Sequence, residues 1–227
     1  MTILTAKTGT NADLFPDVLA LYAKPGDRIL DMTYGKGVFW KKVDRSQYRV
    51  VTNDCIMPAD YDYDCRQTGF NPADFDVVIF DPPYMHTSGT VKESIAKCYQ
   101  TNTSAVFKNQ KDVDAFFVAG ISEARRLLCK GGYCIVKCQD TIESAKPKWT
   151  HVKIMQAEGF VCEDLFVMVQ NGTPAMSGRW SRQYHARKNH SYFIVLKKLS
   201  GPSGAVARTT GGARQPSQRA CSLNNFE

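Results

Sequence analysis

Close pairs of metal-binding side chains are missing from this chain of 227 residues. Its eight cysteines include no Cys-x-x-Cys pair, and its four histidines form no recognisable ligand spacing. Zinc sites are usually built from such close pairs, so we expect no metal. The cysteines are instead typical of small buried hydrophobic side chains in a reducing compartment.

Long hydrophobic runs are also missing. No apolar stretch approaches the roughly 20 residues that a membrane-spanning helix needs. The opening residues Met1 to Lys7 lack the apolar core of a secretory signal peptide. We therefore expect a soluble cytoplasmic protein without a membrane partner.

Acidic residues are nearly absent from the last quarter of the chain. Residues 1–170 carry 20 Lys and Arg against 21 Asp and Glu, whereas residues 171–227 carry 9 basic residues against Glu227 alone. This uneven charge fits a polyanionic partner or a solvated basic tail, and charge alone does not choose between them. Beyond Leu199 large apolar residues are rare, so we expect one domain over residues 1–199 and a disordered basic tail over 200–227.

The most informative stretch that is present runs from Asp76 to Tyr84. Its apolar residues Val77 to Phe80 predict a buried parallel strand. Pro82 and Pro83 cannot donate ladder hydrogen bonds, so the strand must end before them. In an open α/β sheet ligands bind at the carboxyl ends of strands, which is where this pattern puts Asp81 and Tyr84.

A glycine-rich turn precedes that strand. Residues 28–32 predict a short buried strand, and Thr33-Tyr34-Gly35-Lys36-Gly37 then predicts a turn that opens a helix at Val38. Strand, glycine turn and helix form the first half of a Rossmann-like unit that lets a ligand approach the backbone. Asp54 ends the next predicted strand, 19 residues after Gly35, at the spacing typical of a ribose-binding acid.

The remaining pattern predicts alternating helices and strands. A helix beginning near Asn11 or Asp13 ends before Pro25, and an amphipathic helix over 113–130 is followed by the capping pair Gly131-Gly132. Further strands are predicted over 133–138, 160–170 and 191–198, with a helix over 149–158. Because no helix separates the last two strands, they should pair antiparallel.

Two longer segments have little periodicity. Residues 85–111 follow the proline turn directly and are candidates for a lid or a nucleic-acid-contacting loop. Residues 171–190 interleave basic and aromatic side chains, which suits phosphate contact and base stacking. The alternative is a hairpin loop whose aromatic side chains pack back on the sheet. The nucleic-acid candidates are Arg179, Trp180, Arg182, Tyr184, Arg187 and Lys188.

Asp81-Pro82-Pro83-Tyr84 resembles the catalytic motif of the S-adenosylmethionine-dependent DNA amino-methyltransferases, which methylate adenine N6 or cytosine N4. Residues 11–16 look like the first cofactor motif of that family, and residues 31–37 are similar to its Asp-Pro-Phe-x-Gly-x-Gly. Met32 and Thr33 replace the usual Pro and Phe. The cofactor region precedes the catalytic motif, which is the gamma-like order, and no large target-recognition domain flanks either one.

The resemblance implies a Rossmann-like class I methyltransferase fold, with a seven-stranded, mostly parallel sheet, one antiparallel strand and helices on both faces. It implies methyl transfer to an exocyclic amine, most often adenine N6 for this tetrapeptide. Asp81 and the Pro82 carbonyl would hold the amine, and Tyr84 would stack on the base. The implied catalytic residues are Asp81, Pro82, Pro83 and Tyr84. The implied cofactor contacts are Phe15, Asp31, Met32, Thr33, Tyr34, Gly35, Gly37, Asp54 and Asp64, the last one on the adenine amino group.

Other functions share these motifs. RNA enzymes that methylate guanine N2 or adenine N6 of tRNA or rRNA carry similar residues, and cytosine N4 of DNA is a further target. A nucleic-acid-binding protein without activity is disfavoured because the tetrapeptide is intact. Protein glutamine methylation usually goes with Asn in place of Asp81. The chain has no Pro-Cys pair, which argues against cytosine C5 chemistry.

Overall fold

The computed structural model describes residues 2–84, 107–172 and 182–200. Within these ranges seven strands form one sheet in the order β1-β8-β9-β5-β4-β2-β3, and β6 and β7 form a separate hairpin. β9 pairs antiparallel with both β5 and β8, whereas the other pairs in the sheet are parallel. The strands are β1 (Ala6–Gly9), β2 (Arg28–Asp31), β3 (Arg49–Thr52), β4 (Phe75–Phe80), β5 (Leu128–Cys138), β6 (Thr141–Glu143), β7 (Lys146–Lys148), β8 (Phe160–Gln170) and β9 (His190–Lys198).

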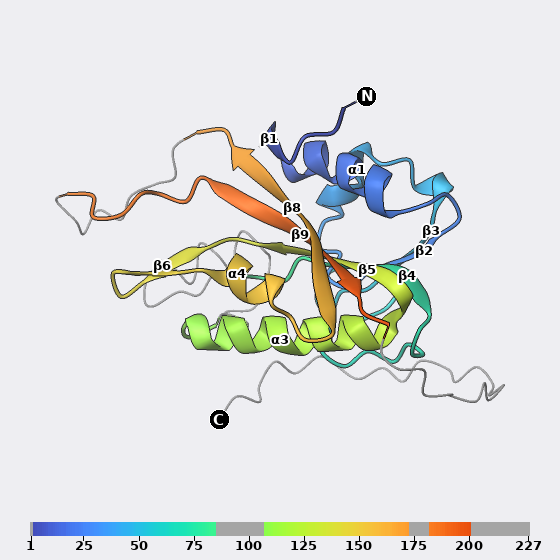
Figure 1. Cartoon of the computed structure of the whole chain (residues 1–227). Helices are drawn as coiled ribbons and strands as arrows, with labels where there is room; N and C mark the ends of the chain where they lie inside the picture. The colour runs from blue at the N-terminus through green and yellow to red at the C-terminus, as the bar shows by residue number, and fades with distance from the viewer. Residues whose placement is uncertain (1, 85–106, 173–181, 201–227) are drawn as a thin grey trace.

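Helices cover both faces of the sheet, as Figure 1 shows. One face carries α1 (Asn11–Tyr22), and the other carries α3 (Gln110–Leu127) and α4 (Thr150–Met155). Alternate residues of the central strands point into two separate cores. Val77 and Ile79 of β4 join the core beneath α1, while Val78 and Phe80 join the core beneath α3. Both faces of the central strands are therefore buried, which explains their continuous apolar sequence. The expected sheet with one antiparallel strand and helices on both faces is confirmed.

One of the seven strands was not expected. The turn-like sequence at residues 8–11 contains the end of β1, which pairs in parallel with β8 from Ala6↔Val167 to Gly9↔Gln170. The Lys7 ammonium then reaches α1, where it pairs with Asp17 at 2.6 Å. A four-residue edge strand with this partly exposed polar pattern carries no apolar run to signal it.

The helix expected to open at Val38 begins there, as a short 3-10 helix over Val38–Lys42. The expected end of α3 was wrong. The pair Gly131-Gly132 does not cap α3, because that helix ends at Leu127 and β5 begins at Leu128. The glycines lie where the register between β4 and β5 slips, and a Cβ on Gly132 would lie 2.6 Å from the Asp76 carbonyl oxygen. Close approach of two backbones explains the glycine there.

The strand order positions a ligand site. The chain passes from β2 to β3 on one side of β2, and then returns to place β4 on the other side. Ligands of open α/β sheets bind at such a reversal, outside the carboxyl ends of the strands. In this sheet the reversal lies between β2 and β4, whose last pair of opposed residues is Asp31↔Ile79. No helix in the described ranges is long and apolar enough to cross a membrane.

Candidate active site

Three aspartates follow the carboxyl ends of the strands at this reversal. Asp31 ends β2, Asp54 lies two residues beyond β3, and Asp81 comes directly after β4. The segments are tied to one another by backbone bonds. The Met32 N–H donates to the Ile79 carbonyl at 2.9 Å, and the Tyr34 N–H donates to the Asn53 carbonyl at 3.0 Å. The sequence motifs thus meet at one edge of the sheet.

The glycine turn has the conformation that its sequence predicts. Gly35 has φ 56° and Gly37 has φ 63°, both in the left-handed region that favours glycine. A Cβ on Gly37 would lie 2.5 Å from the Tyr34 hydroxyl, so that phenol ring covers the second glycine. Above Gly35 the nearest atom to such a Cβ is the Thr33 carbonyl at 4.0 Å. The backbone at Gly35 is therefore open to close approach.

Asp54 is fixed against the glycine turn. Its Oδ2 accepts from the Gly35 N–H at 2.8 Å, and its Oδ1 accepts from the N–H groups of Ile56 and Met57 at 2.9 and 2.8 Å. Three backbone bonds leave at least one of the roughly four acceptor positions of a carboxylate. The spacing of 19 residues between Gly35 and Asp54 thus corresponds to a direct contact.

Asp31 is a buried carboxylate. It is 3 % exposed, and its Oδ2 accepts from the Trp40 indole N–H at 2.8 Å. Burial raises the pKa of Asp31 to about 7, because the bonds from Trp40 and Thr33 only partly offset the loss of water and because Asp81 and Asp54 add repulsion. Phe15 packs edge-on against Trp40 and has no exposed surface. Phe15 supports the Trp40 indole, and because the Phe15 ring is fully buried, it could contact a ligand only if the ring moved.

Asp81 is positioned through both its backbone and its side chain. Its N–H donates to the Thr33 hydroxyl at 2.8 Å, which links the Asp-Pro-Pro-Tyr motif to the glycine-turn segment. Its Oδ1 lies 4.0 Å from the Lys137 ammonium of β5. Burial raises the pKa of the Asp81 carboxyl, and the Lys137 charge opposes that rise. A positive group is thus placed to keep this carboxylate ionised.

Lys137 was not singled out in the sequence. It is 2 % exposed, donates to the Tyr84 hydroxyl at 3.3 Å, and lies 5.1 Å from the centre of the Tyr84 ring. Burial would lower the pKa of Lys137, but Asp81 and Tyr84 raise it by more. The available signal was a single lysine inside the apolar strand 133–138, since lysine is rarely buried without a partner.

Two carboxylates of the acidic loop after β3, Asp60 and Asp64, bind groups of the protein itself. Asp60 accepts from the Thr52 N–H and hydroxyl at 2.9 and 2.8 Å. Asp64 forms an ion pair with Arg66 at 2.5 Å. Burial raises the pKa of Asp64, but the bonds to Arg66 lower it by more, so the pKa lies below its usual value. A contact between Asp64 and an adenine amino group would have to share the oxygens that bind Arg66.

Residues 182–189, the described end of the basic aromatic segment, lead into the last strand, β9. Of the six nucleic-acid candidates, Arg179 and Trp180 lie outside the described residues. The Arg182 guanidinium lies 4.6 Å from the centre of the Tyr184 ring, and Tyr184 is 59 % exposed. The Lys188 ammonium lies 4.2 Å from the centre of the Trp149 ring, and Arg187 is partly buried. Tyr184 therefore does not pack back on the sheet.

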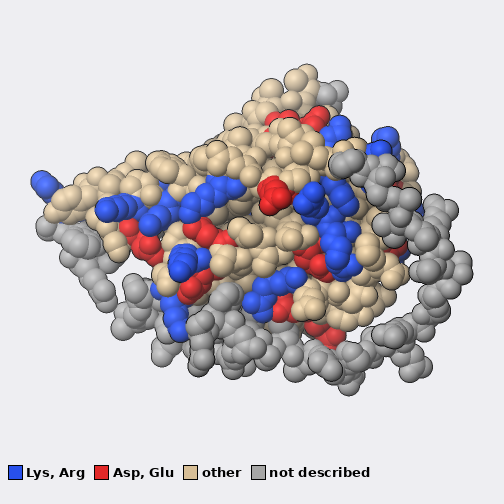
Figure 2. Space-filling model, turned by 60° about the horizontal axis from the view of Figure 1, so that its bottom comes forward, with Lys and Arg blue, Asp and Glu red and all other residues tan. Residues whose placement is uncertain are grey.

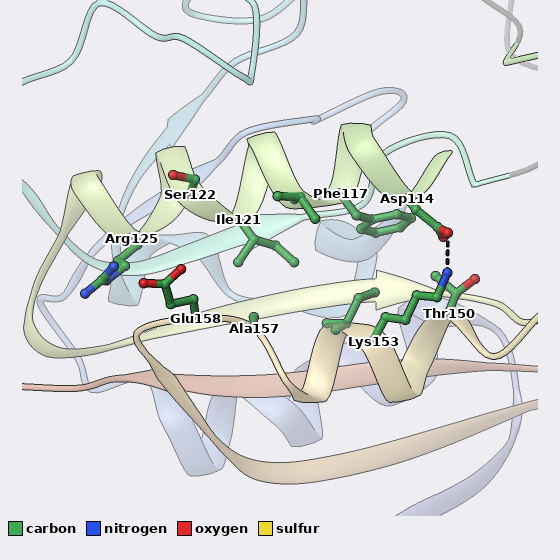
Figure 3. A pocket seen from close by; sticks show the side chains of 11 residues that line it. Asp114, Phe117, Ile121, Ser122, Arg125, Thr150, Lys153, Ala157 and Glu158 are labelled. Carbon is green, nitrogen blue, oxygen red and sulfur yellow. Dashed lines mark hydrogen bonds and ion pairs between the residues drawn. The ribbon is translucent and has the colours of Figure 1, made fainter. Parts of the chain in front are cut away.

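A groove between α3 and α4 is a separate feature (Figure 3). It has a volume of about 200 Å³ and an apolar floor that includes Phe117, Ile121 and Ile154. The ion pair between Lys153 and Asp114 spans one end, and Arg125 and Glu158 lie at the other. These helices cover the face of the sheet opposite α1, whereas Asp31 and its partner Trp40 lie on the α1 side, so the groove is not part of the site at the strand ends.

The fold has counterparts among solved structures. TrmN from Thermus thermophilus superposes with a TM-score of 0.50 and 17 % identity, over 83 % of this chain and 49 % of TrmN, so the chain spans about half the length of that protein. A candidate methyltransferase from Bacillus halodurans C-125 gives a TM-score of 0.50 and 14 % identity, over 82 % of this chain and 99 % of its own. No family model and no curated protein matches the chain in sequence. At these identities the likeness concerns the fold, which is that of the Rossmann-like class I methyltransferases.

Proposed function

We propose that this protein transfers a methyl group from S-adenosylmethionine to the exocyclic amino group of a DNA base, with adenine N6 as the first choice. One observation carries the proposal. Asp81-Pro82-Pro83-Tyr84 begins at the carboxyl end of β4, and Asp81 is hydrogen-bonded through its N–H to Thr33 of the glycine-turn segment. The motif that resembles an amine-binding site and the motif that resembles a cofactor site are thus in contact at the strand reversal.

The glycine turn fits the cofactor. Space above Gly35 admits a ligand close to the backbone, and Asp54 keeps an acceptor position beside it for a ribose hydroxyl. The buried Asp31 carboxylate is a suitable counter-ion for a positively charged ligand. When bound, S-adenosylmethionine supplies a methyl group on a positively charged sulfur.

The residues after β4 would prepare the amine. An exocyclic amine shares its lone pair with the ring and is a weak nucleophile. Asp81 and the Pro82 carbonyl would accept its two N–H bonds and favour a pyramidal nitrogen whose lone pair faces the methyl group. Pro82 and Pro83 stiffen this turn, and such alignment can lower a barrier by roughly 7 kcal/mol or more. Tyr84 would stack on a base that is extruded or already single-stranded.

A transfer assay tests the proposal. The protein is incubated with methyl-labelled cofactor and either DNA or RNA, and the labelled base is identified. We expect label in DNA, and we expect Asp81→Ala to abolish it while cofactor binding is retained. The matched control is Glu163→Ala, which removes an exposed carboxylate from β8 and should leave transfer unchanged.

Three results would contradict the proposal. Label in RNA alone would replace DNA by RNA as the substrate. Unchanged transfer by Asp81→Ala would refute the role of that carboxylate, and an absence of label with either polymer would favour a binding protein that uses this fold as a scaffold.

A further inference from the structure

Two exposed aromatic side chains lie beyond the catalytic motif, each beside a basic side chain. Trp149 is 48 % exposed and has the Lys188 ammonium 4.2 Å from its ring centre. Tyr184 is 59 % exposed and has the Arg182 guanidinium 4.6 Å from its ring centre. Half of the aromatic side chains in the described ranges are buried, and only Tyr61, Trp149 and Tyr184 are exposed, the last two most of all.

Both aromatic–basic pairs lie on segments that are attached at the end of the sheet where β4 leads into Asp81. Phe80 pairs with Val136, and β5 then ends at Cys138, opposite Tyr192 near the start of β9. The Gln139 side-chain amide donates to the carbonyls of Lys188 and His190 at 3.1 and 3.0 Å. His185 contacts the Ala145 carbonyl at 2.8 Å, which ties the segment to the β6–β7 hairpin. Trp149 and Tyr184 are therefore carried by two segments that are joined to each other beside the site.

The charge of these two segments is strongly positive. Residues 141–148 and 182–189 contain one acidic side chain, Glu143, which pairs with Lys148 at 3.2 Å. Figure 2 shows Lys and Arg side chains along the arm at the left, where the hairpin and residues 182–189 lie in Figure 1. The basic side chains of the two segments are Lys146, Lys148, Arg182, Arg187 and Lys188.

We propose that Trp149 and Tyr184 are stacking platforms for the unpaired bases of a single strand of DNA, with Lys188 and Arg182 contacting its phosphates. The inference rests on the proposed function for its choice of DNA. Stacking on an aromatic face needs an unpaired base, because the faces of paired bases are covered by their neighbours in the duplex. Aromatic side chains beside a basic track are the usual means of holding a single strand, and they are tolerant of its sequence. Such a surface would hold the strand that flanks a target base at Asp81.

A binding measurement without cofactor tests this inference. Fluorescence anisotropy of a labelled single-stranded DNA oligonucleotide is followed for the wild type and for Trp149→Ala and Tyr184→Ala. We expect each substitution to weaken binding about tenfold, and Trp149→Phe to recover most of the loss. Lys188→Gln should lower the slope of log affinity against log salt by about 0.7, as expected for one lost phosphate contact on a single strand.

The controls separate stacking from folding and from catalysis. Val118→Ala removes an exposed hydrophobic side chain from α3 and should bind as the wild type does, and thermal melts should verify that each variant is folded. Equal binding by Trp149→Ala and wild type, tighter binding of a duplex, or tighter binding of the matching RNA strand would overturn the inference. Oligonucleotide binding without methyl transfer would refute the proposed function alone, and methyl transfer with unchanged binding by Trp149→Ala would refute the platforms alone.

Discussion

Lys137 and Asp31 are buried charged residues that lie on neighbouring sides of Asp81. Asp31 adds negative charge from β2, and Lys137 adds positive charge from β5. Burial raises the pKa of the Asp81 carboxyl and the Lys137 charge opposes that rise, while repulsion from Asp81 contributes to the raised pKa of Asp31. Replacing Lys137 should therefore change the pH dependence of methyl transfer, and replacing Asp31 should change the pH dependence of cofactor binding. Loss of a residue with a purely structural role would change neither.

Lys137→Met should move the acid limb of methyl transfer to higher pH. Without the ammonium at 4.0 Å, burial raises the pKa of Asp81 further, so the carboxylate is lost at a higher pH. A charge at this distance is worth about one pH unit or more. The measurement is the pH profile of labelled transfer, with Lys153→Met on α4 as the control. A profile for Lys137→Met that superimposes on the wild type would refute this electrostatic role.

Asp31 should couple cofactor binding to pH. With a pKa of about 7, its carboxyl is increasingly protonated below neutral pH, whereas a cationic cofactor binds best to the ionised form. Calorimetric affinity for S-adenosylmethionine should therefore fall as pH drops through about 7, by at most tenfold per unit. Asp31→Asn should bind weakly and with little pH dependence. A wild-type affinity that stays constant between about pH 6 and 8 would contradict the coupling.

The candidate site was predictable to the extent that its residues follow strands in recognisable motifs. Asp31, Gly35, Asp54 and Asp81 were found because strand ends and glycine spacing are local signals. Lys137 was missed because its significance depends on pairing between β4 and β5, which are separated by more than 40 residues of sequence. Contacts of that kind are decided by tertiary structure, not by a motif.

At the scale of single elements, α3 shows how closely the helix layer approaches β4, the strand that precedes Asp81. Gly120 faces β4, and a Cβ there would lie 2.2 Å from Cζ of Phe80, the residue before Asp81. Phe80 is fully buried and in ring contact with Phe116 and Phe117, so it has little room to move. The glycine is needed for packing, although it weakens the helix.

Gly120→Ala should destabilise the protein. Alanine favours a helix by about 1 kcal/mol over glycine, but overpacking against an immobile ring costs about 1–3 kcal/mol. Denaturant unfolding should therefore show a net loss of stability, and methyl transfer should fall because Phe80 shifts Asp81. Ser122→Ala, at an exposed position of the same helix, is the matched control and should be neutral or slightly stabilising. A Gly120→Ala variant that is more stable than the wild type would contradict this packing.

Element boundaries were less predictable than element types. Strand β8 was predicted over its full length, because an apolar run bounded by Gly159 and Asn171 is a local signal. The end of α3 was not, because the pair Gly131-Gly132 suits both a helix cap and a backbone bulge, and only the register with β4 selects the bulge. The 3-10 form of the helix after Gly37, whose Phe39 and Trp40 rings contact Phe15, had no local signal either.

At the scale of the whole molecule, the sheet separates two kinds of surface. Its carboxyl edge gathers the aspartates, the proline turn and the basic aromatic segments, while the α3–α4 groove lies on one face. The fold class was implied by the resemblance of the motifs, and the absence of a helix between the last two predicted strands agreed with its one antiparallel strand. The pairing of β1 beside β8 did not follow, since 150 or so residues separate them.

The central claim is tested most directly by mapping modified bases at single-base resolution in DNA from cells that express the protein. We predict N6-methyladenine at defined sites in cells with the wild type and its absence in cells with Asp81→Ala at equal protein levels. Methylation at N4 of cytosine in place of adenine would correct the base. An absence of any modified base in wild-type cells, or equal modification with Asp81→Ala, would contradict the account.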